Sequence, residues 1–204
     1  VNTRSMRWNI PLPDSALAYA CDAVPDPARR TLVLSPCSSH ELRNWSVARY
    51  AALADHAVQR HGMDVLLCGG RSPLELDYGA RIEQEMRQPC RNLIGRDTLL
   101  EFLATLQRST VLVSPDSGPA HMATTVGTPV IGLYAATNPE RSGPYYSRRW
   151  CVDRYDRAAT RFLNRSAGKK IELPGVMDLV EVDDAIEMLD NLMLAGAPRT
   201  PTGL

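Results

Sequence analysis

Short apolar runs alternate with amphipathic stretches from residue 31 onward, and this alternation limits the fold more than any other feature of the sequence. The apolar runs, each short enough to be a strand, lie at residues 31–35, 63–68, 92–94, 110–114, 129–134 and 150–153. Helical periodicity marks residues 46–61, 73–87, 98–107, 117–126 and 183–194. Strands that alternate with helices at this spacing form right-handed crossovers and a parallel sheet covered on both faces. We therefore predict an α/β fold with a doubly wound, Rossmann-like parallel sheet.

Capping signals place several helix ends. Ser46 is expected to cap the helix over residues 46–61, and Gly62 to end it. Asp97 is expected to cap the helix that begins at Thr98. The region after Tyr134 is rich in Arg, Pro and Tyr and is predicted to be a long loop before the last strand.

Residues 1–30 differ from the rest of the chain. They contain prolines at positions 11, 13, 25 and 27 and a single helix-like piece, "DSALAYAC". We interpret residues 1–30 as a linker, or as the end of a preceding lobe, and residues 31–204 as one domain with a carboxyl-terminal helix.

Charge is balanced overall but uneven along the chain. The 23 basic and 23 acidic side chains give a formal net charge of zero, which argues against a nucleic-acid partner. The segment that begins at Arg141 and ends at Lys170 holds nine Lys or Arg against two acids, whereas residues 172–190 hold seven acids and no Lys or Arg. Either a solvated loop or a docking surface for an anionic partner explains the basic segment.

The cysteines and histidines match no metal-binding motif. Five widely spaced cysteines, an odd number, favour reduced thiols and a cytoplasmic protein. No pair has C-x-x-C spacing, and "HELRN" at residues 40–44 has Asn where a zinc motif needs its second His. The sequence therefore predicts no metal site.

The turn "SPDSGPAH" at residues 114–121 joins a predicted strand to a predicted helix. A helix that begins there exposes backbone N–H groups at the positive end of its dipole, which is a site for phosphate. Ser117 adds a hydroxyl, and Gly118 lets a ligand approach the backbone. Asp116 either caps the helix or accepts hydrogen bonds from ligand hydroxyls, and His121 either supports a neighbouring loop or contacts the ligand.

Two further loops follow predicted strands, where ligands bind in doubly wound sheets. The first, "SPCSSHELRNW", offers the hydroxyls of Ser38 and Ser39 and the planar cation of Arg43, which suits a diphosphate. The second, "CGGRSPLE", carries Glu75, which either holds ribose hydroxyls or is an exposed helical acid. The usual Gly-rich nucleotide motifs are missing from the sequence.

Taken in order, these motifs resemble the carboxyl-terminal half of family 9 glycosyltransferases, the bacterial ADP-heptose:lipopolysaccharide heptosyltransferases. The likeness runs from about Thr31 to Asp153 and is carried by "NLIGRDTLLEFLATLQRS" and above all by "SPDSGPAHMATTVGTPVIGLYAATNPERSGPY". It implies that the chain is one lobe of the two-lobed GT-B fold. The amino-terminal lobe, which binds the acceptor and supplies the general base in this family, would then lie outside these residues, so that no catalytic residue is expected in the chain.

The resemblance also implies roles for individual residues. Ser38 and Ser39 would approach the diphosphate, Arg43 would contact the donor, and Glu75 would lie near the ribose. The adenine would be bordered by Thr98 and Leu99. The β-phosphate and the sugar would be held by Asp116, Ser117 and Gly118, with His121 supporting the loop. The family often has Lys where Arg43 stands.

The function implied is transfer of heptose from ADP-heptose to the lipopolysaccharide inner core with inversion, by an enzyme of which this chain is the donor-binding half. The ADP-sugar is then a substrate, with no tightly bound cofactor expected. The basic segment from Arg141 to Lys170 would allow peripheral contact with the inner membrane. A non-catalytic nucleotide-binding module and a UDP-sugar epimerase of the same architecture are the alternatives.

Overall fold

The centre of the protein is a six-stranded sheet in which all neighbouring strands are parallel. The computed structural model describes residues 8–163 and 170–197. The strands are β1 (Thr31–Leu34), β2 (Asp64–Leu67), β3 (Arg91–Asn92), β4 (Val111–Pro115), β5 (Val130–Tyr134) and β6 (Val152–Asp153). Their spatial order is β3-β2-β1-β4-β5-β6, so the predicted doubly wound sheet is confirmed.

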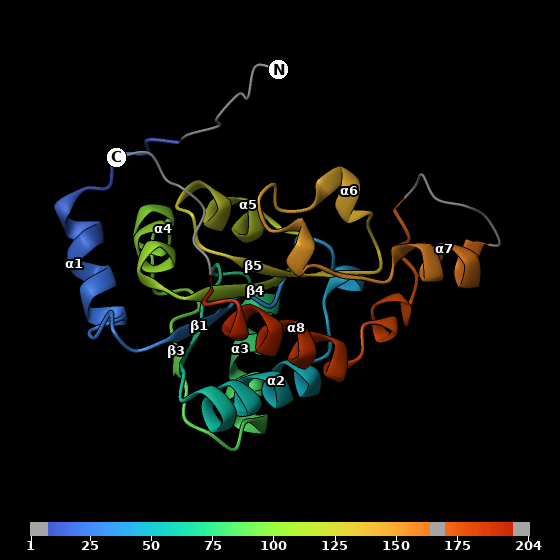
Figure 1. Ribbon diagram of the computed structural model, residues 1–204, viewed down its shortest axis with the longest axis horizontal. Helices are drawn as coiled ribbons and strands as arrows, with labels where there is room; N and C mark the ends of the chain where they lie inside the picture. The colour runs from blue at the N-terminus through green and yellow to red at the C-terminus, as the bar shows by residue number, and fades with distance from the viewer. Residues whose placement is uncertain (1–7, 164–169, 198–204) are drawn as a thin grey trace.

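Helices connect the strands and cover both faces of the sheet (Figure 1). The α-helices are α1 (Asp14–Ala23), α2 (Val47–His61), α3 (Pro73–Glu85), α4 (Leu99–Arg108), α5 (Gly118–Thr125), α6 (Pro139–Ser142), α7 (Tyr155–Leu163) and α8 (Val182–Leu194). Short 3₁₀ turns occur at Glu41–Arg43, Arg148–Trp150 and Val176–Leu179.

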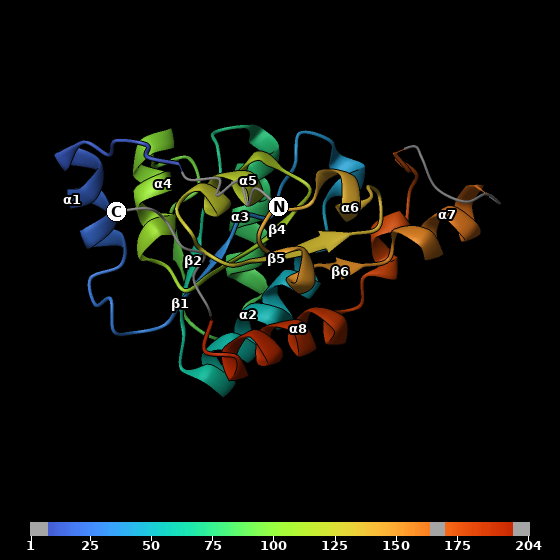
Figure 2. The same ribbon diagram turned by 45° about the horizontal axis from the view of Figure 1, so that its top comes forward.

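Alternate residues of β1 pack into two separate hydrophobic cores. Leu32 and Leu34 of β1 pack with the helices α2, α3 and α8, whereas Val33 packs with α1, α4 and α5 on the other face. The two groups of helices lie on opposite sides of the sheet in Figure 1, and Figure 2 shows α8 beside α2. Because β1 is buried on both faces, its sequence is a continuous apolar run rather than an alternating one.

Helix α1 packs against α4 through small side chains. Ala16 and Ala20 of α1 and Ala104 of α4 are buried together, and the absence of larger side chains lets the two helices approach closely. Helix α1, which belongs to the segment before residue 31, therefore packs on the layer of helices that covers one face of the sheet. The division of the chain at residue 30 stays a prediction.

The structure confirms most of the expected helix ends and corrects one. Ser46 accepts a hydrogen bond from the Arg49 N–H, and Gly62 takes a left-handed conformation at the end of α2. The expectation that Asp97 caps α4 is wrong, because Thr98 occupies the cap. Its hydroxyl accepts from the Glu101 N–H while the Glu101 carboxylate accepts from the Thr98 N–H, a reciprocal capping box.

The region predicted as a long loop between Tyr134 and the last strand contains a short helix, α6, and a further helix, α7, follows that strand. In α7 the residues Tyr155, Ala158 and Ala159 are buried, with Phe162 partly buried against the same core. This spacing of three and four residues is helical, but it stands among arginines, and Asp153, whose carboxylate accepts from the Tyr155 N–H at 2.9 Å, belongs to the predicted last strand.

Within the described residues, none of the helices is both long enough and apolar enough to cross a lipid bilayer.

The packing of α1 on α4 gives a testable prediction. Replacing Ala20, which is fully buried, with Leu should force the two helices apart and lower the free energy of unfolding by about 1–3 kcal/mol, measured by urea denaturation. The same substitution at Ala18, which is exposed on α1, should change it by less than about 0.5 kcal/mol. Equal effects at the two positions would contradict the packing described.

Candidate functional site

The candidate site lies where the carboxyl ends of β1 and β4 meet. The strand order reverses between these two strands, and ligands of doubly wound sheets bind at that point. Two hydrogen bonds fix the start of both loops: Ser35 N donates to Val113 O at 3.1 Å, and Ser114 Oγ donates to Ser35 O at 3.0 Å. The loops that follow β1 and β4 are therefore held side by side.

The turn after β4 contains a short chain of hydroxyl groups. Ser114 Oγ and Ser117 Oγ are 2.7 Å apart. A hydroxyl carries only one hydrogen. Because the Ser114 hydroxyl donates its hydrogen to Ser35 O, Ser117 must be the donor in the hydrogen bond between the two serines. Ser117 would have to turn its hydrogen away from Ser114 in order to donate to a ligand.

Helix α5 begins at this turn without a side-chain cap. Ser117 occupies the cap position, but its side chain accepts no hydrogen bond from the helix. The alternative in which Asp116 caps the helix is therefore wrong; its carboxylate instead accepts from Ser142 Oγ at 3.0 Å. A Cβ built on Gly118 would meet nothing within 4 Å, so the space beside the helix end is open. His121 is exposed, and its side chain makes no hydrogen bond to any other described residue.

The loop after β1 holds its serines in different ways. The hydroxyl of Ser38, a residue that is almost fully buried, donates to the carbonyl of His40 and accepts from the His40 N–H. Its backbone N–H donates to Asn44 Oδ1 at 2.7 Å. Ser39 is exposed. Ser38 thus shapes the loop, and Ser39 presents the free surface.

Arg43 is already paired with an acid. Its Nε donates to Glu172 Oε1 at 3.0 Å and its Nη2 contacts the same oxygen, while His40 Nε2 lies 3.4 Å from Glu172 Oε2. The hydrogen bond from Arg43 lowers the pKa of Glu172. Because Glu172 is 129 residues away in the sequence, this partner was not foreseen.

Glu75 turns back onto the loop that precedes it. Its carboxylate accepts from Gly70 N at 2.7 Å and from Ser72 Oγ at 2.6 Å. Glu75 is half-buried, so the interpretation as a merely exposed helical acid is wrong. The carboxylate sits at the carboxyl end of β2, next to the loop after β1.

The loop after β3 presents apolar side chains to solvent. The side chain of Thr98 is used in the capping box, but Leu99 beside it is 69% exposed. Leu76, on α3, is 47% exposed, and its side chain lies near Gly95 of the same loop. Sequence reasoning did not single out Leu76, because its helix position alone does not show that it faces this loop.

A cavity of about 290 Å³ opens beside Asp116. Arg141 and Lys170 bring two positive charges to its wall, and Asn138 brings an amide. The complete lining is Asp116, Thr137, Asn138, Arg141, Ser142, Tyr155 and Lys170. These cations were predicted only as members of a basic segment, of which residues 164–169 lie outside the described residues.

The comparison with protein families identifies the chain. The profile described as glycosyltransferase family 9 (heptosyltransferase) matches residues 1–171. The chain belongs to glycosyltransferase family 9.

Individual family 9 proteins agree with this assignment. The lipopolysaccharide core heptosyltransferase OpsX of Haemophilus influenzae is 32% identical over 193 residues, which cover 92% of this chain and 55% of that protein. A family 9 glycosyltransferase of Veillonella parvula has a similar fold, with a TM-score of 0.77, 19% identity and coverage of 96% of this chain and 56% of that one. Heptosyltransferase WaaC of E. coli, solved with ADP, matches at a TM-score of 0.58 and 15% identity over 84% of this chain and 48% of that one. The chain thus spans about half the length of these relatives.

Asp97 directly precedes Thr98 and Leu99, the residues expected to border the adenine, and it allows a test by pH. Burial raises its pKa to about 6, and its Oδ2 has no hydrogen-bond partner among the described residues. The pKa of such an aspartate is higher in the folded state than in the unfolded state, so between about pH 4 and pH 6 the folded state binds more protons. The free energy of unfolding therefore falls as the pH rises through that window. We expect Asp97→Asn to be more favourable, relative to wild type, at pH 8 than at pH 4, by about 1–2 kcal/mol in unfolding free energy. If the difference in unfolding free energy between Asp97→Asn and wild type, measured by urea denaturation, stayed constant across this pH range, the raised pKa of Asp97 would be contradicted.

Proposed function

We propose that this chain is the donor-binding half of a heptosyltransferase that transfers heptose from ADP-heptose to the lipopolysaccharide inner core with inversion. The observation that carries the proposal is the uncapped start of α5, beside Ser117 and Gly118, at the point where the strand order reverses. Membership in family 9 and the likeness to a heptosyltransferase solved with ADP support the choice of reaction and donor.

The proposed chemistry rests on the charge of the leaving group. When an acceptor hydroxyl attacks the anomeric carbon, negative charge grows on the departing diphosphate. Helix N–H groups and hydroxyls aimed at that charge stabilise the transition state, and removal of one such donor from comparable sites costs about 3 kcal/mol. Ser117 and the N–H groups at the start of α5 would provide these donors, with Gly118 leaving room for the phosphate.

Asp116 is proposed to act on the sugar rather than on the phosphate. A carboxylate repels phosphate but accepts hydrogen bonds from hydroxyl groups. Asp116 already accepts one from Ser142 and faces the cavity that Arg141 and Lys170 line. The sugar would occupy this cavity, and the two cations would offset the charge of the neighbouring diphosphate. His121, at the exposed side of α5, would support the loop.

The nucleoside is proposed to lie across the loops after β2 and β3. An ionised carboxylate has about four lone-pair sites, and Glu75 uses two of them within its own loop. The remaining sites can accept from ribose hydroxyls without loss of the loop. The exposed side chain of Leu99, together with Thr98, would border the adenine.

Arg43 is proposed to contact the donor while it stays paired with Glu172. A guanidinium has five N–H donors, and the pair with Glu172 engages Nε and Nη2. The acid reduces the net charge that the loop offers to a phosphate. Arg43 would therefore position Ser39 and the donor more than it would attract the diphosphate, with Ser38 holding the shape of the loop.

The other half of the reaction is proposed to lie outside these 204 residues. We assign no general base to the chain and place the base and the acceptor site on an amino-terminal lobe, with residues 1–30 as its end or as the linker. The 204 residues would then bind ADP without turnover. The ADP-sugar is a substrate in this proposal, and no bound cofactor is invoked for the transfer.

Two alternatives predict different ligands. A UDP-sugar epimerase of the same architecture would prefer UDP, and a non-catalytic module would bind a nucleotide without any catalytic partner. Two heptosyltransferases, OpsX of Haemophilus influenzae and heptosyltransferase 3 of E. coli, match the chain in sequence over 92% and 82% of its length, which favours the transferase. A calorimetric panel of ADP, UDP, GDP and CMP separates the donor classes, and we expect a preference for ADP.

Ser117→Glu tests the proposed phosphate site directly. A carboxylate at the start of α5 would stand within about 4 Å of a bound diphosphate, and like-charge repulsion there should weaken ADP binding at least about 100-fold, measured by calorimetry. Ser15→Glu makes the same change of charge on the exposed side of α1 and should leave the affinity unchanged. Equal affinities for ADP in the two variants would refute the phosphate site.

We also propose that the basic segment from Arg141 to Lys170 brings the enzyme to the anionic surface of the inner membrane. Arg148 lies 6.0 Å from the ring centre of Tyr145, and Arg149 lies 4.7 Å from that of Trp150. Aromatic rings and exposed arginines together suit the interface between water and lipid headgroups. Part of the charge is offset, since Arg148 also lies 3.7 Å from Glu140.

Charge reversal tests this contact. Arg148→Glu combined with Arg149→Glu should weaken binding to anionic phospholipid vesicles by at least about 30-fold at low salt, because each arginine near such a surface contributes about 1 kcal/mol. The matched control reverses Arg60 and Arg81, which are exposed on α2 and α3. Unchanged vesicle binding by the Arg148 and Arg149 variant in a sedimentation assay would leave only a solvated loop.

A further inference from the structure

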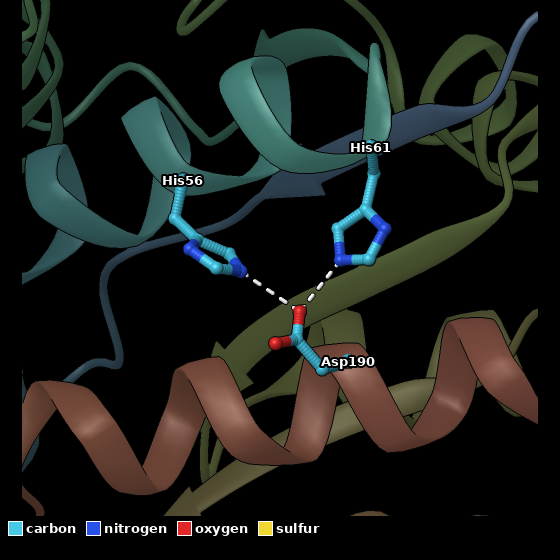
Figure 3. A group of neighbouring side chains, drawn as sticks. All are labelled: His56, His61 and Asp190. Carbon is cyan, nitrogen blue, oxygen red and sulfur yellow. Dashed lines mark hydrogen bonds and ion pairs between the residues drawn. The ribbon is translucent and has the colours of Figure 1, made fainter.

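Three side chains from two helices converge at a point that the proposed function does not use. His56 and His61 lie on α2, and Asp190 lies on α8. His56 Nε2 is 2.8 Å and His61 Nε2 is 2.6 Å from the same atom, Asp190 Oδ1. Figure 3 shows both rings turned towards this oxygen, while the second carboxylate oxygen has no dashed line to either ring.

The cluster is remote from the proposed donor site. Helix α2 starts after the loop at the carboxyl end of β1 and has 15 residues, so it extends about 22 Å. His61 is its last residue and precedes β2 by three positions. It therefore lies at the amino-terminal edge of the sheet, opposite the edge that carries Ser117 and Gly118.

One carboxylate oxygen of Asp190 is shared by the two imidazoles. The neighbouring acid Asp55 is committed elsewhere, since both its oxygens accept from the Arg87 N–H. Asp190 is thus the acid that faces the two imidazoles.

We propose that His56, His61 and Asp190 form a binding site for one Zn²⁺ ion. Two imidazole nitrogens and one carboxylate oxygen are ligands that zinc accepts, and water would complete a tetrahedron. The three candidate ligand atoms all lie within 4.8 Å of one another. Because the site is far from the donor, the ion would act as a clip between α2 and α8 and not as a catalyst.

The geometry needs only a small adjustment to accept the ion. Ligand bonds of about 2.0–2.1 Å in a tetrahedron separate the ligand atoms by about 3.3 Å. Each nitrogen would therefore move away from Oδ1 by less than an ångström, and the two nitrogens, which lie within 4.8 Å of each other, would be brought to the same spacing by rotation of the side chains. Each Nε2 would then give its lone pair to the metal, and the ring proton would sit on Nδ1. The side chain of Asp190 is 36% exposed and that of His56 is 24% exposed, which leaves access for an ion and a water molecule.

The first experiment uses the wild-type chain, freed of metal by a chelator. We expect one equivalent of Zn²⁺ to bind in calorimetry and to raise the melting temperature, because the ion binds the folded state. In heteronuclear NMR of the imidazole rings, two of the four histidines should shift. Co²⁺ in place of Zn²⁺ should give the strong visible absorption of a tetrahedral site. The proposal is overturned if no ion binds, or if the two shifted rings are not His56 and His61.

Variants then distinguish a metal site from a cluster that only forms hydrogen bonds between α2 and α8. Asp190→Asn keeps an oxygen that accepts from the imidazoles but loses the charge, and His61→Gln removes a nitrogen ligand. Loss of an outer partner of a metal ligand already costs about 10–100-fold in affinity, so each variant should lose at least about 100-fold for Zn²⁺. His40→Gln, outside the cluster, should bind like wild type. Equal Zn²⁺ affinities in all four proteins would show that the cluster only ties the helices together.

Discussion

The parallel pairing of β1 with β4 is the constraint on which the site depends. It places Leu34, the last residue of β1, opposite Val113, and β4 continues from there to Pro115. The hydrogen bond from Ser114 Oγ to Ser35 O then joins the loops that leave them. Both loops turn away from each other because their helices cover opposite faces, and the proposed donor would reach the start of α5 at the gap between them.

Charge is distributed around this gap in pairs rather than as one positive surface. Arg43 faces Glu172 on one side, whereas Arg141 and Lys170 face Asp116 on the other. In the proposed binding mode, the diphosphate beside this cavity would be attracted mainly by Arg141 and Lys170 and by the helix dipole of α5. The neutral sum of the whole chain therefore says little about the local field, because opposite charges lie at separate points.

Local patterns predicted the sheet, because strand and helix periods differ and residues 31–134 follow them closely. The same patterns missed the capping box of Thr98, since Asp97 is an equally good cap by type and only the path of the loop decides between them. They also missed α7, whose apolar stripe is narrow. The partner of Arg43 and the lining of the cavity could not be predicted, because Glu172 and Lys170 follow α7 and reach the site only through the fold.

Helices α2 and α8 are in contact both near the start and near the end of α2. Near the start of α2, Trp45 Nε1 donates to Val180 O at 2.7 Å, and Arg49 pairs with Glu181 at 2.7 Å. Near its end, His61 meets Asp190. Contacts that advance in the same order along both helices fix their register at two places. Glu172 lies on the segment that leads into α8, and the N–H of the neighbouring Ile171 donates to Ala136 O at 2.7 Å, so this segment is anchored beside the end of β5 as well as through α8.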